Sequence, residues 1–319
     1  MKSQHWSSVS GGKDSTATTT LGVEWREKTG HPFYGVFADT GNEHPATYDY
    51  VRYLEEKTGI PIRWVKADFS ADMERKRAFI ARKWPLDGIP QERVDRAVKL
   101  LHPTGNPFLD LCMMKGRFPS RRAQFCTEKL KRDPILEQVI LPIIDDGEAV
   151  WSWQGIRRDE ANSPDHPRSK LTINEHVGGN YWIHRPIYRW TVQDVFAQHA
   201  RHGIEPNPLY RQGMNRVGCM PCINCAKEEL REIAKRFPEE IERIAEWEAI
   251  ASEASKRGHT TFFSYDKTPG EHQRHKDLPM PGIKVVVEWS KTARGGRQYD
   301  LMVAADTESG CTSAYGLCE

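Results

Sequence analysis

The most specific stretch of the chain is SGGKDS, residues 10–15, which lies between a short apolar run and a helical pattern. Adjacent glycines let the backbone turn so that successive N–H groups point at one anion, and the following helix adds the positive end of its dipole. The stretch therefore predicts a phosphate site, although no G-x-x-x-x-G-K-[ST] loop can be drawn through it. A glycine turn with a solvated lysine is the alternative, and we would favour it for a Gly-Gly pair alone. The predicted binding residues are Ser10, Gly11, Gly12, Lys13, Asp14 and Ser15.

Three cysteines are spaced C-x2-C-x2-C in GCMPCINC, at Cys219, Cys222 and Cys225. Thiolates at this spacing converge readily on one metal ion or cluster. Candidates for a fourth ligand are Cys126, Cys311 and Cys318. Spacing does not separate an iron–sulfur cluster from a structural Zn²⁺, since both accept four thiolates. Three buried structural cysteines are the alternative, and Cys112 is expected to be a buried apolar residue.

Further polar residues follow predicted strands. Asp39, Thr40 and Gly41 end one strand, where ligands bind in open α/β sheets. Gly155, Arg157 and Arg158 follow another, and the arginines could contact phosphate. For Arg158 the alternative is a surface ion pair with a neighbouring carboxylate. Asp14 could place Mg²⁺ or cap its helix, and the sequence does not decide between these roles.

The elements that must position these residues alternate along the first two hundred residues. Strand patterns are expected at 5–10, 32–41, 61–68, 148–160 and 180–188, and helices at 14–30, 42–59, 133–147 and 191–203. Such alternation predicts βαβ units and a doubly wound, mainly parallel sheet. Thr191 is expected to cap the last of these helices. A long charged helix, 226–257, is expected to break or kink at Pro238, with an apolar stripe in the core.

Residues 70–120 interrupt the alternation and predict a helical insertion, with 102–110 as a loop. We divide the chain into a nucleotide-binding α/β domain, 1–205, and a Cys-rich C-terminal extension, 206–319. This extension is expected to hold the Cys-rich loop, the long helix and a tail with strand patterns at 283–289 and 298–304.

Composition indicates a globular protein, with 38% hydrophobic and 28% charged residues among 319 and a formal net charge of +2. No apolar run approaches a membrane span and the N-terminus has no secretory h-region, so we expect a cytoplasmic protein without a membrane partner. Residues 115–132 contain seven Lys or Arg, and 291–300 contain three more. Such runs suit a nucleic-acid partner, a small nucleotide or a solvated face.

Six segments together resemble the 3′-phosphoadenylylsulfate (PAPS) reductase family within the adenine nucleotide α-hydrolase, or N-type ATP pyrophosphatase, superfamily. They are SGGKDS, FADTGNEHPATYDYV, RRAQFCTEKLKRDP, GIRRDEAN, RPIYRWTVQDVF and NPLYRQGMNRVGCMPC. The resemblance runs from residue 6 to roughly residue 230. It implies a Rossmann-like fold in which the loop holds the pyrophosphate of ATP while a nucleophile attacks the α-phosphorus.

This family includes sulfonucleotide reductases and the proteins of DNA phosphorothioation, in which adenylylation precedes sulfur insertion. Reductases generally lose the intact loop and carry a C-terminal Glu-Cys-Gly-Leu-His motif, whereas this chain keeps the loop and ends in YGLCE. The resemblance therefore implies ATP, with Mg²⁺, as substrate, and an adenylyl-forming enzyme of sulfur transfer. A thioredoxin-dependent reductase and a nucleotide-binding subunit without turnover are the alternatives.

The resemblance also implies roles for residues and partners. The expected catalytic residues are Lys13, Asp14, Ser15 and Cys126. A [4Fe–4S] cluster is favoured over zinc, because related members carry one. A cysteine desulfurase or another sulfur donor is an expected partner, and a nucleic acid is one option for the acceptor.

Overall fold

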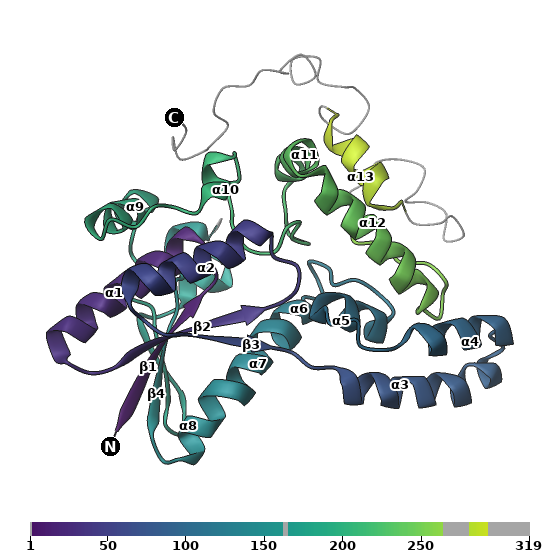
Figure 1. Ribbon diagram of the computed structural model, residues 1–319, viewed down its shortest axis with the longest axis horizontal. Coiled ribbons are helices and arrows are strands. Elements are labelled where there is room, and N and C mark those ends of the chain that lie inside the picture. Colours follow the sequence, from purple (N-terminus) through teal and green to yellow (C-terminus); the bar gives the residue numbers. More distant parts are fainter. Residues whose placement is uncertain (1, 162–164, 264–280, 293–319) are drawn as a thin grey trace.

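The computed structural model describes residues 2–161, 165–263 and 281–292. Its centre is a six-stranded sheet (Figure 1) in the order β3-β2-β1-β4-β6-β5. The strands are β1 (Ser3–Val9), β2 (Phe33–Asp39), β3 (Ile62–Lys66), β4 (Ala149–Trp153), β5 (Asn174–Gly178) and β6 (Tyr181–His184). All neighbouring pairs are parallel except β5 and β6, which are antiparallel. The chain moves outward from β1 through β2 to β3 and then returns to add β4 on the other side of β1.

Helices cover both faces of this sheet (Figure 1). On one face lie α1 (Lys13–Thr29), α2 (Pro45–Thr58) and α9 (Val192–Arg201). On the other face a continuous helix runs through α6 (Phe125–Thr127), η2 (Glu128–Arg132), α7 (Asp133–Ile135), η3 (Leu136–Ile140) and α8 (Leu141–Asp145). Its Val139 and Ile140 pack with Trp6, Val36 and Val65 of the sheet. The sheet is therefore apolar on both faces, as the doubly wound prediction requires.

Local signals set the ends of these helices. Gly30 and Gly59 stop α1 and α2 in the left-handed conformation, and their N–H groups bond to helix carbonyls. Thr191 caps α9 through a capping box with Asp194, as predicted. The threonine-rich α1 is helical despite its β-branched residues, and its hydroxyls are satisfied by carbonyls one turn back, such as Thr18 donating to Asp14 O at 2.9 Å.

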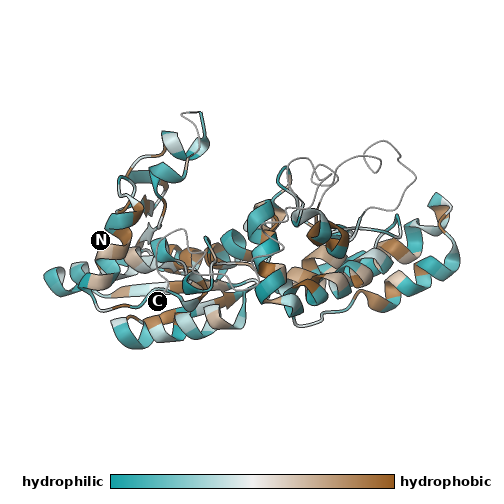
Figure 2. Cartoon of the chain, turned by 90° about the horizontal axis from the view of Figure 1, so that it is seen from above, coloured by the Kyte–Doolittle hydropathy of each residue, from teal (hydrophilic) through white to brown (hydrophobic). Residues whose placement is uncertain are grey.

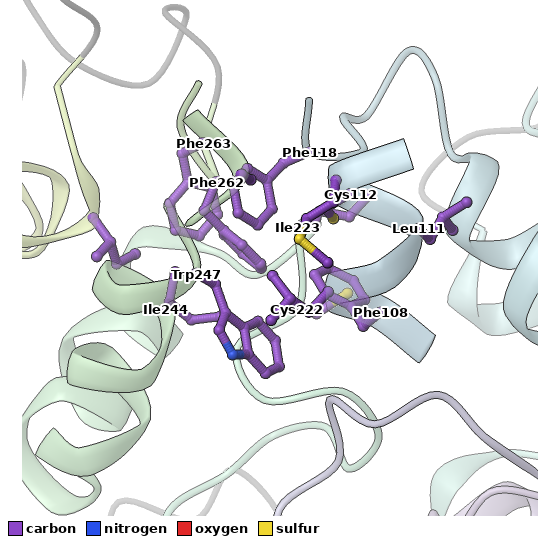
Figure 3. Close-up of a cluster of buried hydrophobic side chains, with 14 of the residues drawn as sticks. Phe108, Leu111, Cys112, Phe118, Cys222, Ile223, Ile244, Trp247, Phe262 and Phe263 are labelled. Carbon is purple, nitrogen blue, oxygen red and sulfur yellow. The ribbon is translucent and has the colours of Figure 1, made fainter. Parts of the chain in front are cut away.

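The insertion and the C-terminal region form a second, helical body. The insertion contains α3 (Ser70–Lys83), η1 (Pro85–Asp87), α4 (Gln91–Leu100) and α5 (Pro107–Lys115), and the C-terminal region contains α11 (Lys227–Arg236), α12 (Pro238–Glu253) and α13 (Ile283–Ser290). Their side chains share one buried core. In Figure 3 Phe108 of α5 lies against Trp247 of α12, with ring centroids 5.6 Å apart. Figure 2 shows this body beside the sheet along the long axis of the molecule.

Several details of the C-terminal region follow the predictions. The long helix is broken at Pro238, which begins α12. Its predicted apolar stripe is buried, and Cys112 is buried as well. The stripe consists of Leu230, Ile233, Phe237, Ile241, Ile244 and Trp247.

Two element predictions are wrong. The expected loop 102–110 contains the start of α5, because Asn106 caps the helix by accepting from Leu109 N–H and Pro107 follows at the first helical position. The expected strand at 283–289 is α13, since Ile283, Val286, Val287 and Ser290 form one buried helical face despite three consecutive valines. The strand pattern at 298–304 lies outside the described residues.

Edge strand β5 has no counterpart among the predictions, because its exposed sequence carries little apolar alternation. Three short turns of helix complete the fold: η4 (Arg158–Glu160), η5 (Pro167–Lys170) and α10 (Pro208–Arg211). In the described residues no helix is long and apolar enough to cross a membrane.

Candidate functional site

The glycine loop joins β1 to α1, where the carboxyl end of a central strand meets a helix N-terminus. Gly11 has a φ of 71°, and a Cβ there would lie 2.8 Å from Thr47 Cγ2, so glycine is required for both conformation and space. The Ser10 hydroxyl donates to Ser15 Oγ at 3.0 Å, and Ser15 donates to Gly12 O at 2.9 Å. The two serines thus brace the turn from inside.

Three side chains outside the loop form hydrogen bonds with its backbone. One comes from α9, and two come from the segment that follows α9. Tyr210 accepts the Lys13 N–H at 2.9 Å, Asn207 donates to Gly11 O at 3.2 Å, and His199 Nε2 lies 2.8 Å from Lys13 O. All three are buried. Sequence reasoning did not assign them to the site, although Asn207 and Tyr210 belong to the NPLY segment that carried the family resemblance.

Charged groups balance one another beside the loop. Lys13 Nζ lies 2.9 Å from Asp14, and Arg157 Nε donates to the other oxygen of Asp14 at 2.5 Å. Arg157 also pairs with Asp159. Burial lowers the pKa of Arg157, but the carboxylates of Asp14, Asp159 and Glu160 outweigh burial and hold it above its ordinary value. Asp14 is therefore ion-paired, and no described side chain caps the start of α1; its role toward Mg²⁺ stays a prediction.

The loop after β4 reaches this cluster through Gly155. A Cβ at Gly155 would lie 2.7 Å from the carbonyl carbon and oxygen of Asp14, so the two loops are in backbone contact. The two arginines that follow separate. Arg157 is buried against Asp14, whereas Arg158 is exposed and lines a cavity of about 580 Å³ together with Arg189 and Trp190. Arg158 forms no ion pair among the described residues.

The residues after β2 form a separate network. Asp39 accepts from Gly41 N–H at 2.9 Å and from the Tyr48 hydroxyl at 2.8 Å. Burial, followed by nearby Glu43 and Asp39, raises the pKa of Tyr48 well above its ordinary range. Thr40 is buried and bonds through both N–H and hydroxyl to Glu43. These residues support each other at the end of β2, beside the strand that leads to the glycine loop.

The cysteine segment is attached to this same strand end. Asn42 O accepts from Met220 N–H at 2.7 Å, and Asn42 Nδ2 donates to Pro221 O at 3.0 Å. Cys219 Sγ donates to Glu43 at 3.7 Å. The pKa of Cys219 is raised to about 12. Burial is the main cause and Glu43 adds to it, while nearby Lys131 acts in the opposite direction. Glu43, which sequence reasoning missed although it lies two residues after Gly41, thus faces a protonated thiol.

The described cysteines do not fit a metal centre. Among the residues that the structure describes, no group of three or more His, Cys, Asp or Glu side chains could hold a metal ion. Cys219 donates to a carboxylate, and Cys222 Sγ accepts from Asn224 N–H at 3.5 Å. Cys222 lies near enough to Cys219 and Cys126 to raise the pKa of both, but the described side chains do not come together as a set of metal ligands. The tail cysteines Cys311 and Cys318 lie outside the described residues, so the structure does not test them as ligands.

Cys126 lies in α6, at the start of the helix that covers the second face of the sheet. It is half-buried in the helical body and packs against its core. Burial, and then the charge of Cys222, raises the pKa of Cys126. A raised pKa leaves less thiolate at neutral pH, and the thiolate is the nucleophile. Among the described side chains, Cys126 forms no hydrogen bond to residues 10–15.

The site and the sheet define a Rossmann-like α/β protein with a PP-loop-like nucleotide-binding fold. The sequence pattern of the phosphoadenosine phosphosulfate reductase domain family matches residues 4–225, from β1 through the C-x2-C-x2-C segment. The chain belongs to this family, as its motifs predicted.

The relatives include phage proteins and sulfonucleotide reductases. An uncharacterised 37.8 kDa protein of Escherichia phage 186 is 46% identical over 98% of this chain and 96% of its own length. An adenosine 5′-phosphosulfate reductase of Neisseria meningitidis is 27% identical over 46% of this chain and 58% of its own. Among solved structures, PAPS reductase from Candida auris, in a phosphate complex, has a TM-score of 0.40 at 16% identity, covering 68% of this chain and 81% of that one.

Proposed function

We propose that the chain binds ATP at residues 10–15 and adenylylates a substrate, with release of pyrophosphate, as one step of a sulfur-transfer reaction. The observation that carries this proposal is the intact SGGKDS loop in backbone contact with the β4 loop. The strand order reverses between β1 and β4, and the crevice at such a reversal is where open α/β sheets bind ligands. A sulfonucleotide has no β,γ-pyrophosphate for such a loop to hold.

Each residue of the loop has a role in this proposal that follows from its chemistry. Ser10, the exposed member of the loop, and the backbone of Gly11 and Gly12 bind the pyrophosphate end. Lys13 neutralises the charge that builds on the leaving pyrophosphate, provided that it exchanges Asp14 for phosphate. Arg157 keeps Asp14 occupied during that exchange. Ser15 holds the turn through Gly12 O.

The remaining predicted binding residues take supporting positions in this proposal. Asp39, Thr40 and Gly41 form the neighbouring wall at the end of β2, and Arg158 in its cavity is free to meet a ligand phosphate. Because Asp14 is already held by two cations, we assign the Mg²⁺ that accompanies ATP to the phosphate oxygens. No step is assigned to an iron–sulfur cluster, since the described cysteines do not form one.

The test uses ATP labelled at the α-phosphate, with pyrophosphate and adenylylated product measured together. The wild type is expected to release pyrophosphate, and Ser10→Ala and Lys13→Ala are expected to reduce this at least about tenfold, as one lost charge-assisted contact would. Lys28→Ala, an exposed lysine at the far end of α1, is the control. Turnover that survives both loop substitutions would reject the proposal, and tight ATP binding without pyrophosphate would indicate a nucleotide-binding subunit.

A sulfonucleotide reductase is the second candidate, because relatives named as such align with this chain. A phosphoadenosine 5′-phosphosulfate reductase of Alkalilimnicola ehrlichii is 25% identical over 69% of this chain and 71% of its own. Its reaction would need a nucleophilic thiol, and Cys126 and Cys318 are the candidates. Sulfite release from PAPS or adenylyl sulfate with thioredoxin distinguishes the two activities. The sulfur donor, the acceptor and the likeness to phosphorothioation proteins remain predictions.

A further inference from the structure

A second cavity of about 580 Å³ opens in the helical body, away from the glycine loop. Its walls come from α3, from the turn after α5 and from the segment after α12. It shares no lining residue with the proposed ATP site. Its basic lining residues are Lys76, Lys115, Arg117, Lys256, Arg257 and His259, and Asp87 is the one acidic residue of the lining.

The described residues neutralise little of the positive charge of this cavity. Asp87 accepts hydrogen bonds from Lys256 at 2.8 Å and from Lys83 at 2.6 Å, so this carboxylate does not neutralise the other cations of the lining. The other four lysines and arginines of the lining have no carboxylate partner among the described residues. Burial, and then the charge of Lys115, lowers the pKa of Lys76. Like charges held this close destabilise one another and favour a bound anion.

Aromatic rings accompany these cations. Phe79 lines the cavity and is 43% exposed, and it is the only Phe, Tyr or Trp in the described chain whose side chain is classed as exposed. Lys76 Nζ lies 5.4 Å from the centroid of its ring. Phe118 and Phe262, which are buried, also line the cavity. Their ring centroids lie 5.5 Å apart, and Figure 3 shows the two side chains in the core of the helical body. An exposed ring at the rim of a basic cavity is a platform on which a flat ring can stack.

We propose that this cavity binds a single-stranded polynucleotide, with Lys115, Arg117 and Arg257 on backbone phosphates and a base stacked on Phe79. The cavity is much larger than one phosphate group needs. The exposed Arg121 and Arg122 continue the positive charge outward after Ser120, at its edge, which a free phosphate or mononucleotide would not use. Basic residues along a groove combined with stacking rings are the common means of binding single strands. This site goes beyond the proposed ATP chemistry and needs no turnover.

The test measures fluorescence anisotropy of a labelled, mixed-sequence 16-nucleotide DNA strand with the full chain, without ATP. The double variant Lys115→Ala/Arg117→Ala is expected to bind about tenfold more weakly and to reduce the slope of log affinity against log salt by about 1.4, two phosphate contacts on a single strand. Phe79→Ala is expected to weaken binding about tenfold at all salt concentrations, and Phe79→Tyr to restore it.

The control is Lys28→Ala/Arg63→Ala, which removes the same charge from exposed positions on the sheet body. Thermal unfolding of each variant shows whether it is folded, and Arg257→Glu on the opposite wall provides an independent second variant. An affinity and a salt slope unchanged in the cavity variants, or reduced equally in the control, would overturn the proposal. Displacement of the strand by AMP or inorganic phosphate at equal phosphate concentration would also overturn it, since it would indicate a site for small anions.

Discussion

At the scale of single residues, the site is a balanced set of charges. Lys13 and Arg157 face Asp14, and Arg157 also faces Asp159. An incoming pyrophosphate therefore competes with Asp14 for Lys13, while the buried Arg157 retains its hold on the carboxylate. Removing Arg157 would leave Asp14 bound to Lys13 alone, so the lysine would be less available to the nucleotide.

A second residue makes stability depend on pH. Glu248 is buried in α12 and accepts from Phe262 N–H at 2.7 Å and from Ile283 N–H at 2.8 Å. Burial raises the pKa of Glu248 to about 7, although these N–H groups lower it. Because the folded pKa is above the unfolded value of 4.5, the contribution to stability is complete below pH 4.5 and is lost as pH rises through about 7.

We therefore expect the free energy of unfolding to fall between pH 5 and pH 8 by up to about 3 kcal/mol, at about 1.4 kcal/mol per pKa unit, through Glu248. Urea titrations of the wild type and of Glu248→Gln at several pH values measure this. The free energy of unfolding of the wild type minus that of Glu248→Gln should fall as pH rises. The same difference for Glu246→Gln, which changes an exposed glutamate on the same helix, should stay constant with pH. A constant difference for Glu248→Gln would contradict the assignment.

Residue types predicted part of the site. SGGKDS predicted the strand–helix loop because its glycines and helix start are local properties, and the structure places it there. The adjacent arginines look alike in sequence, but only the fold separates the buried Arg157 from the exposed Arg158. Tyr210 and His199 were missed because they approach the loop backbone from almost two hundred residues away.

At the scale of elements, the site depends on the contact between the β1 and β4 loops. We expect Gly155→Ala to force Asp14 and the start of α1 to move, because the new Cβ would lie 2.7 Å from the Asp14 backbone. The variant should lose about 1–3 kcal/mol of stability and most of its ATP affinity. Calorimetric titration with ATP measures the second effect. Gly147→Ala, where a Cβ would meet nothing within 4 Å but a φ of 81° makes alanine unfavourable, should lose some stability and keep its ATP affinity. Equal ATP affinity in Gly155→Ala and the wild type would contradict this role.

Helices and strands were predictable where the apolar pattern agreed with the residues that end an element. The parallel strands and their helices followed from apolar runs ended by glycine, as at Gly30 and Gly59. The segment containing α13 was misassigned because three valines favour a strand locally, whereas packing against α11 and α12 decides for a helix. Metal ligation could not be judged from C-x2-C-x2-C, because spacing does not fix how the fold arranges the thiols, and among the described residues they form no group that could hold a metal ion.

At the scale of the whole molecule, the insertion and the C-terminal helices share one core and should unfold as one cooperative unit. Trp247 is buried between them and stacks on Phe108. We expect Trp247→Ala to cost about 3–5 kcal/mol within this body. Hydrogen exchange should then speed up jointly in α5, α12 and α13, while the sheet strands stay protected. Exchange that increases in α12 alone, or equally in β1 and β2, would contradict a shared helical core.

The central claim is that the intact loop holds the pyrophosphate of ATP, and nucleotide affinity tests it most directly. Calorimetric titrations would compare ATP, AMP and PAPS on the wild type and on Lys13→Ala. The account predicts that ATP binds at least about tenfold more tightly than AMP or PAPS, and that Lys13→Ala removes this preference, since a charge-assisted phosphate contact is worth about 1.5–3 kcal/mol. Tighter binding of PAPS than of ATP, or an ATP preference that persists in Lys13→Ala, would contradict it.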